Sequence, residues 1–511
     1  MKTYEYAIMA GRVYISTRGE VNRFPIPADW SQFKHEKENS GFEAVSFENS
    51  ETKEVVISFA GRAPGWSRDN WESFCLYNGD PSDQLREAAV YYLKVKQEYG
   101  KDYKITVTGH SLGGGLASLI GVFFNVHAET FDQAPFSRSA TVAMREDLIN
   151  YLTTSQNGNP ALFKRSDLES LAPELFTFTN LAERAGNVTG RYVQGEILSN
   201  WFSSMIGTQL PLQHNSTGVS STQLHAQSLL TLFLMNPKFQ ELSKEPENKG
   251  PYLKSLISMM NDGQLFYHDP NDTDSPDENF AERLIRYQVG VNVAGEPPVT
   301  ANDMLTRFTN DLYKIAAQGG LSLTNEAMQK ALTAFAMEKY YTEQPDSTNE
   351  LFNTEGITEG GGLHFKVSDV AASLTGDEGA KGYNLYFDTY LNGWKPEEKA
   401  VLEGTKDWYV QAGTPALKAK AGAERAFMIG GDQGDELTGG GASDVLYGGK
   451  GNDKLTGGAG DDLLIGGEGN DIFEGGSGQD TILGDHGNDF VYGSNRNDAL
   501  FGETVKSFLS T

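Results

Sequence analysis

The alternation of hydrophobic and polar positions near the start of the chain predicts a β-hairpin followed by a helix. Residues 41–60 (GFEAVSFENSETKEVVISFA) alternate apolar and polar side chains on both sides of an acidic turn, which indicates two β-strands. Residues 84–99 carry Leu85, Ala88 and Tyr92 at helical spacing, so one face of this helix is apolar. We expect this amphipathic helix to lie on the sheet that the hairpin begins.

The most informative pattern comes next, in residues 104–121 (KITVTGHSLGGGLASLIG). β-Branched residues typical of a buried strand lead into Gly109-His110-Ser111-Leu112-Gly113, and small residues that can open a helix follow. This is the strand, sharp turn and helix of a G-x-S-x-G nucleophile elbow. Ser111 is then the predicted nucleophile, and the N–H of Leu112 points to where an oxyanion would form. The alternative is a glycine-rich turn with an idle serine.

The order of these elements indicates the class of the first domain. The chain runs strand, helix, strand, elbow and helix, which is typical of an α/β-hydrolase. A lipolytic site of this class needs a second oxyanion donor from a loop after an early strand. The backbone of Gly61 or Arg62, directly after the predicted hairpin, is placed to supply it.

Several of these segments resemble the lipase class 3 family and its bacterial relatives among secreted lipases and phospholipases A1. The resemblance rests on FAGR followed by DNW, on GHSLGGGLASL, on TFDQ at 130–133, and on the later YVQGEILS and LHAQSLL. It covers about residues 1–235 and implies a serine hydrolase that acts on lipid esters. One departure is that Arg62 stands where class 3 lipases usually carry a small hydroxyl residue, so only its backbone donor carries over.

A serine nucleophile needs a base and an orienting acid, which follow it in this order: serine, acid, histidine. His225 opens an apolar run and matches the family's late motif, so we predict it as the general base. His127 begins the strand after the elbow and reads as structural, while His214 lies in a polar loop.

The acid is less clear from the sequence. Glu196 follows Gly195 at the end of a strand-like stretch, where the third member of a triad belongs. Glu183 and Asp132 are the alternatives, and a surface ion pair is the simpler explanation for each of the three. We favour Glu196.

Residues 137–173 form an insertion with helical patterning, which fits either a lid with an apolar underside or a plain structural helix pair. From about residue 236 to 410 the chain reads as mainly helical, with further helices expected at 325–341 and 396–410. The acidic loop at 268–278 lacks the spacing of an EF-hand, and a solvated loop is the expected state.

A nine-residue repeat begins near Gly430 and reads GGKGNDKLT, GGAGDDLLI and GGEGNDIFE. It is similar to the G-G-x-G-x-D-x-U-x repeat of RTX proteins, which fold as calcium-binding parallel β-rolls. The apolar residue two places after each repeated aspartate should stack inward, and the carboxylates should hold several structural Ca²⁺ ions. The predicted calcium ligands are Asp435, Asp444, Asp453, Asp462, Asp471, Asp480, Asp489 and Asp498. The alternative, a flexible glycine- and aspartate-rich linker, does not explain eight copies in one register.

Composition narrows the setting in which the protein works. The formal net charge is −27, which argues against a nucleic-acid partner and agrees with a cation-binding region. Cys75 stands alone, so no intramolecular disulfide is expected. The first residues lack the pattern of a secretory signal peptide, and no apolar run approaches the length of a membrane span. RTX rolls of this kind resemble those of proteins exported by type I secretion, which implies an extracellular location.

We therefore expect an α/β-hydrolase domain, a helical middle region and an all-β parallel β-roll. The predicted boundaries are 1–235 for the hydrolase, 236–410 for the middle, 411–428 for a linker, 429–503 for the roll and 504–511 for a tail. The expected function is a secreted, calcium-stabilised serine ester hydrolase acting on lipids, either a triacylglycerol lipase or a phospholipase A1. The alternative is a non-catalytic, calcium-dependent surface or toxin protein that uses the hydrolase fold for binding.

Overall fold

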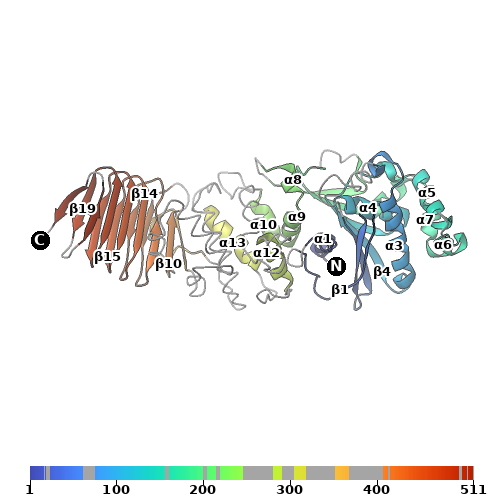
Figure 1. Cartoon of the computed structure of the whole chain (residues 1–511), viewed down its shortest axis with the longest axis horizontal. Helices are drawn as coiled ribbons and strands as arrows, with labels where there is room; N and C mark the ends of the chain where they lie inside the picture. Colours follow the sequence, from blue (N-terminus) through green and yellow to red (C-terminus); the bar gives the residue numbers. More distant parts are fainter. Residues whose placement is uncertain are drawn as a thin grey trace.

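The protein is described here from a computed structural model. It is elongated, with an α/β region at the N-terminal end, a β-roll at the C-terminal end and helices between them (Figure 1). Arg62, the helix expected at 325–341 and the acidic loop at 268–278 lie outside the described residues. The described residues are 1–16, 18, 23–60, 75–155, 160–198, 204–214, 219–244, 280–290, 304–317, 352–366, 405, 407–411, 415–493, 498–502 and 505–509.

The α/β region is built on a seven-stranded sheet in which the strands follow one another in sequence order. The predicted hairpin is present, because β2 and β3 are antiparallel and Ala44 pairs with Phe59. From β3 to β7 all neighbouring strands are parallel, so their carboxyl ends lie along one edge of the sheet. The strands are β1 Ser31–Lys37, β2 Glu43–Asn49, β3 Glu54–Phe59, β4 Lys104–His110, β5 His127–Phe131, β6 Val188–Val193 and β7 Thr208–Leu212.

Helices cover both faces of this sheet, as the class requires. Successive strand residues point to opposite faces, so Val55 packs into one core with α3 and α4, whereas Val56 packs into the other with α1 and α9. The helices of this region are α1 Thr3–Arg12, α3 Asp83–Tyr99, α4 Leu112–Phe123, α5 Val142–Thr153, α6 Arg165–Leu171, α7 Pro173–Thr177, α8 Ser221–Leu224, α9 Gln227–Met235 and α10 Pro237–Leu242. This three-layer arrangement is the α/β fold that the sequence predicted.

The insertion at 137–173 folds as part of the domain core. Leu148 and Leu152 on α5, Leu168 on α6 and Leu175 on α7 are fully buried in the same core as α3. Their burial corresponds to the structural-helix alternative for this insertion, because the apolar sides of these helices already have protein partners.

Two helices of the middle region join the hydrolase to the roll. They are α12 Phe280–Val289 and α13 Met304–Ala317. Leu284 and Phe308 on these helices lie in the same apolar core as Phe233 of α9, and that core continues to Trp408 and Phe427 in the first coils of the roll. One core therefore runs from the hydrolase through the middle helices into the roll.

The C-terminal region is a parallel β-roll with two seven-stranded sheets. Successive strands alternate between the sheets, so strands of one sheet pair with a shift of 18 residues, as Leu437 pairs with Leu455. The apolar residues two places after the repeated aspartates are buried between the sheets as predicted, with Leu500 only partly buried. The strands are β8 Ile357–Gly360, β9 Gly362–Lys366, β10 Asp407–Gln411, β11 Leu417–Lys420, β12 Ala426–Ile429, β13 Glu436–Thr438, β14 Val445–Lys450, β15 Lys454–Ala459, β16 Leu463–Glu468, β17 Ile472–Ser477, β18 Thr481–His486, β19 Asp489–Gly493, β20 Ala499–Phe501 and β21 Val505–Leu509.

The sheets of the roll begin earlier than the repeat in the sequence does. β8 and β9 pair antiparallel with β11 and β10, and they close the N-terminal end of the roll. Residues 407–411 form a strand where the sequence favoured the end of a helix, and 411–428, expected as a linker, contain β11 and most of β12. Residues 505–509 of the expected tail pair with β19 as an edge strand. Within the described part of the chain, no helix combines the length and the hydropathy needed to cross a bilayer.

Candidate active site and candidate calcium sites

Ser111 lies on a strained turn between β4 and α4. Its backbone has φ 57° and ψ −124°, a conformation that non-glycine residues seldom adopt and that clusters at functional sites. The two glycines of the elbow are needed for close approach, because a Cβ on Gly113 would lie 2.0 Å from the carbonyl oxygen of Phe59. A Cβ on Gly109 would lie 2.4 Å from the backbone of Gly113. Strand and helix are thus pressed together, with the serine at the bend.

Backbone hydrogen bonds hold this turn in place. The Ser111 N–H donates to the carbonyl of Phe131 on β5 at 3.0 Å, and its own carbonyl accepts from Ala134 N–H at 2.9 Å. Leu112 is the first residue of α4, so its N–H is among those without a helical acceptor and is free to meet an anion. The Ser111 hydroxyl does not cap the helix. The local geometry thus leaves the hydroxyl available at the positive end of the α4 dipole.

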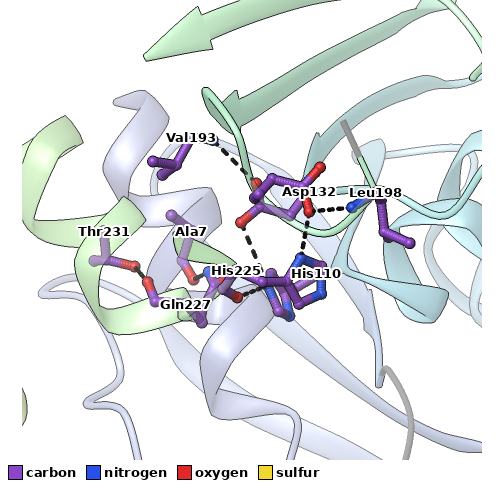
Figure 2. Close-up of polar contacts among 9 residues, drawn as sticks. Ala7, His110, Asp132, Val193, Leu198, His225, Gln227 and Thr231 are labelled. Carbon is purple, nitrogen blue, oxygen red and sulfur yellow. Dashed lines mark hydrogen bonds and ion pairs between the residues drawn. The ribbon is translucent and has the colours of Figure 1, made fainter. Parts of the chain in front are cut away.

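His225 and Glu196 are joined by a hydrogen bond. Nδ1 of His225 lies 2.8 Å from Oε2 of Glu196, and the same oxygen accepts from the N–H of Leu198 at 2.7 Å (Figure 2). The Glu196 side chain is fully buried, whereas His225 keeps about a sixth of its side chain exposed. A carboxylate at Nδ1 fixes the tautomer in which Nε2 is free to accept a proton.

Local structure explains why these two side chains meet. Glu196 follows β6 through Gly195, whose φ of 84° lets the chain turn at the carboxyl edge of the sheet. His225 lies in the short connection between α8 and α9, and α9 packs against α1. Gln227, the first residue of α9, donates from Nε2 to the carbonyl of Ala7 on α1 at 2.7 Å. The position of His225 is therefore fixed by the helix layer under the sheet.

His110 also belongs to this cluster, although the sequence analysis gave it no role. Its Nε2 donates to the backbone carbonyl of His225 at 3.0 Å, and the two rings lie 4.7 Å apart between centroids. Burial, and then the charge of His225, lower the pKa of His110 well below its ordinary value, so this ring is neutral. Its place directly before Ser111 was the available signal, but contact with His225 depends on the fold of residues 115 positions away.

The remaining candidates differ in their surroundings. Asp132 is fully buried at the end of β5, close to His110 and His225. Glu183 is exposed and interacts with Asn180. His127 lies at the start of β5 beside Glu129, as expected of a structural residue, and His214 donates to the carbonyl of Gln194. Among the three candidate acids, Glu196 is the one with a hydrogen bond to His225.

The charge balance at His225 favours its role as a base. Burial lowers the pKa of this imidazole, but the hydrogen bond that His225 donates to Glu196 and the nearby carboxyl groups of Asp132 and Glu196 outweigh burial and raise the pKa above its ordinary value. A raised pKa means a stronger base, and a partly buried imidazole near a carboxylate is a frequent feature of catalytic sites.

His110, Asp132 and His225 offer three potential metal-ligand atoms within 4.8 Å of one another. One nitrogen of each imidazole already makes a hydrogen bond within the protein, since Nδ1 of His225 binds Glu196 and Nε2 of His110 binds the carbonyl of His225. A metal ion here would also occupy the imidazole that a serine hydrolase needs as its base. We therefore interpret the cluster as a polar network and assign no metal to it.

The repeated aspartates of the roll are arranged differently, as a ladder. One oxygen of each accepts a backbone N–H from the strand 18 residues earlier, as Asp462 Oδ1 does from Asp444 N–H at 2.7 Å. The second oxygen is buried and has no hydrogen-bond partner among the described residues in six of them: Asp453, Asp462, Asp471, Asp480, Asp489 and Asp498. Such oxygens are the hard ligands that Ca²⁺ prefers.

Space beside these oxygens also suits a cation. A Cβ on Gly457 would lie 2.4 Å from Oδ2 of Asp462, and a Cβ on Gly466 would lie 2.2 Å from Oδ2 of Asp471. Only glycine leaves this space open, so the repeated glycine and the repeated aspartate act together. The residues present therefore fit a row of bound calcium ions.

The first two repeated aspartates differ from the other six. Oδ2 of Asp435 accepts from Gly431 N–H at 2.7 Å, and Oδ2 of Asp444 accepts from Gly440 N–H at 2.6 Å. Both oxygens of each carboxylate thus have protein donors, since Leu417 and Ala426 supply the others. In the first coils, therefore, backbone N–H groups fill the hydrogen-bonding positions that calcium would take at the later aspartates.

Comparisons with known proteins agree with both regions. Residues 25–200 match the family described as the Tle-like phospholipase domain, and residues 429–464 and 465–500 match the RTX calcium-binding nonapeptide repeat. No curated protein sequence matches the chain significantly.

Solved structures that resemble the chain include three lipases. Lip2 lipase of Yarrowia lipolytica has 13% identity and a TM-score of 0.26, with 42% of this chain and 78% of that chain covered. The Rhizomucor miehei lipase propeptide complex has 14% identity and a TM-score of 0.21 (39% and 61% covered), and extracellular lipase LipA of Serratia marcescens has 13% identity and a TM-score of 0.20 (98% and 88% covered). At such TM-scores we base no conclusion on these structures. The two family matches confirm the predicted class: the chain combines a region similar to Tle-like phospholipase domains with RTX calcium-binding repeats.

Proposed function

We propose that the α/β region is a serine carboxylic-ester hydrolase acting on lipids, with Ser111 as nucleophile, His225 as general base and Glu196 as orienting acid. The observation that carries this proposal is the 2.8 Å hydrogen bond between His225 and Glu196 beside the strained elbow of Ser111. These residues follow one another in the order that α/β-hydrolases use.

The residues divide the reaction as follows. His225 takes the proton of the Ser111 hydroxyl while the oxygen attacks the acyl carbonyl, and Glu196 stabilises the imidazolium that forms. The N–H of Leu112, with a backbone N–H of Arg62 as second donor, binds the oxyanion. The imidazolium then gives its proton to the leaving alcohol. Water, activated by His225 in the same way, releases the fatty acid and restores Ser111.

We propose a phospholipid as the preferred substrate. The support is the description of the matching family, which names a phospholipase domain. A triacylglycerol is the other lipid ester that this chemistry accepts, since both substrates present an acyl ester to the serine.

We further propose that the roll binds several structural Ca²⁺ ions and that the protein is secreted through a type I apparatus. RTX repeats are typical of secreted proteins, and the unpartnered aspartate oxygens fit calcium. The six carboxylates with a free oxygen are the main ligands in this proposal, with Asp435 and Asp444 in a structural role. Low cytosolic calcium would leave the roll unfolded for passage, and external calcium would fold it.

The test is ester turnover by the full chain in calcium-containing buffer. Vesicles of phosphatidylcholine and an emulsion of triacylglycerol are offered separately, and released fatty acid is measured. We expect faster release from phosphatidylcholine, and loss of at least about a thousandfold in Ser111→Ala. Undiminished turnover in Ser111→Ala contradicts the serine mechanism, and no turnover on any ester favours the non-catalytic binding protein.

A further inference from the structure

Asp132 is a buried carboxyl group that the proposed triad does not use. It follows β5 at the carboxyl edge of the sheet, next to the strand that leads to Glu196. Its side chain is fully buried, and its backbone has φ 43°, an uncommon value for a residue other than glycine. A buried carboxyl group on a strained backbone costs stability, so its presence calls for a compensating function.

The hydrogen bonds of Asp132 aim one of its oxygens at the site. Oδ1 accepts from Val193 N–H at 3.1 Å, and the Asp132 N–H donates to the carbonyl of Arg191 at 2.8 Å, both on β6. Oδ2 has no hydrogen-bond partner in the described part of the chain and lies 3.5 Å from Nε2 of His110. The carboxyl group is thus held by β6 while its second oxygen faces the two histidines (Figure 2).

Two carboxyl groups consequently flank one imidazole. Glu196 lies 2.8 Å from Nδ1 of His225, and an oxygen of Asp132 lies within 4.8 Å of a ring nitrogen of the same histidine. His225 thus has a second carboxyl group close to one of its ring nitrogens.

We propose that Asp132 is a positioning residue of the active site, a second carboxyl group that can orient His225 in place of Glu196. This inference rests on the proposed function, since it assigns a role toward the same base.

The charges around Asp132 are consistent with a carboxyl group that orients His225 only when Glu196 is lost. Burial, together with the negative charge of Glu196, raises the pKa of Asp132 to about 8, while the charge of His225 and the Val193 N–H oppose this rise. The titratable groups that face Asp132 are His110 from β4, Glu196 after β6 and His225 from the α8–α9 connection, and Arg18 acts on His110. Removing the charge of Glu196 takes away one cause of the raised pKa of Asp132, so this pKa falls and the carboxyl group ionises at lower pH when the first acid is lost.

The experiment is a double-mutant cycle on the full chain with calcium and a soluble p-nitrophenyl ester. Glu196→Gln should retain activity well above that of Ser111→Ala, at roughly one hundredth of the unmodified protein. Asp132→Asn alone should lower kcat by less than about tenfold, but in the Glu196→Gln background it should remove at least about tenfold more. Glu183→Gln, an exposed carboxylate, is the matched control and should leave kcat unchanged.

The pH profile separates positioning from a purely structural role. Residual activity of Glu196→Gln should rise as Asp132 ionises, and this step should be absent from the double variant. Thermal unfolding of each variant checks that it is folded, and if Asp132→Asn does not fold, the step in the Glu196→Gln profile remains the test. The proposal is overturned if Glu196→Gln is as inactive as Ser111→Ala. It is also overturned if adding Asp132→Asn to Glu196→Gln changes neither the residual activity nor the pH profile of that activity. Either result leaves the serine mechanism standing, because that mechanism depends on Ser111→Ala.

Discussion

The hydrolase and the roll both bury carboxyl groups, but they complete the surroundings of these groups in different ways. In the hydrolase, Glu196 binds His225 and a backbone N–H, so the protein itself supplies its partners. In the roll, six successive aspartates, from Asp453 to Asp498, each keep a buried oxygen with no donor among the residues that the structure describes. The hydrolase thus supplies partners to the carboxylate that contacts its base, whereas the same incomplete surroundings recur in the coils from Asp453 to Asp498.

This difference implies that the two regions obtain stability from different sources. The hydrolase has apolar cores on both faces of its sheet, and the proposed triad includes no ion. The roll has a core made of one apolar residue per repeat, and we expect its desolvated carboxylates to oppose folding until a cation binds. Calcium should therefore act on folding far more than on ester chemistry.

The change from stabilisation by an apolar core to the expected stabilisation by calcium lies inside the roll. Asp435 and Asp444 have protein donors for both oxygens, and the strands around them pack into the core shared with α9, α12 and α13. Aromatic contacts continue through this core. The ring centroids of Phe365 and Trp408 lie 6.1 Å apart, and those of Trp408 and Phe427 lie 5.0 Å apart. We therefore expect the first coils to be stabilised together with the hydrolase and the later coils to depend on calcium.

The largest expected effect separates chemistry from calcium binding. His225→Ala should lower ester turnover by at least about a thousandfold, because the base and nucleophile act as a unit. The calcium dependence of the roll, followed by circular dichroism, should not change. His214→Ala is the matched control and should retain turnover. Near-normal activity of His225→Ala would refute the assignment of the base.

The next effect concerns the shared core. Trp408 is almost fully buried, so Trp408→Ala should lower the free energy of unfolding by about 3–5 kcal/mol even with calcium present. Tyr492, which is about half exposed, is the control, and Tyr492→Ala should change stability by no more than about 0.5 kcal/mol. Urea unfolding followed by far-UV circular dichroism, which reports backbone structure rather than tryptophan fluorescence, measures the free energy of unfolding of both variants. Equal, small effects would mean that the first coils are not part of the hydrolase core.

A smaller effect is expected from one calcium ligand. Asp462→Asn removes the charge of a carboxylate whose second oxygen has no donor in the described part of the chain, so calcium should bind more weakly there. The calcium concentration at half-folding of the roll should rise roughly tenfold. Asp432→Asn changes an exposed carboxylate in the same repeat array and should have little effect. A calcium titration followed by circular dichroism compares them, and equal midpoints would argue against the ladder of ligands.

The smallest effect is a pH dependence of the calcium-free roll. Burial raises the pKa of Asp453 and of Asp462 to about 7 and that of Asp471 to about 6, from 3.8. The folded roll then binds more protons than the unfolded chain, so stability is present at low pH and is lost as pH rises through about 6 to 7. With chelator, β signal should partly recover on lowering the pH from 8 to 5. A signal that instead falls on acidification would contradict this account.

The sequence predicted those features that depend on short-range chemistry. The elbow around Ser111 is local, because its glycines and its strand and helix are adjacent in the chain. The roll from residue 429 follows from a nine-residue period that repeats without a slip. Its earlier strands could not be found in this way, because β8 to β11 lack the repeat and are held by antiparallel pairing and aromatic packing.

The surroundings of His225 depended on tertiary structure. Glu196 and Asp132 both end strand-like segments, and the sequence does not say which carboxylate reaches the imidazole or how closely. The contact of His110 with the His225 carbonyl joins β4 to a connection much later in the chain. Periodicity and motifs place side chains at a sheet edge, but distances between them come from packing.

Amide hydrogen exchange of the full chain, with calcium and then with chelator, tests most directly whether the hydrolase is independent of the calcium that we expect the roll to need. We predict that chelation removes protection from strands β15 to β19, while β4, α4 and α9, which surround the active site, keep theirs. Protection around β12 should also persist, because that strand packs into the shared core. Loss of protection in α4 and α9 together with β15 to β19 would contradict the account and make calcium a requirement of the whole molecule.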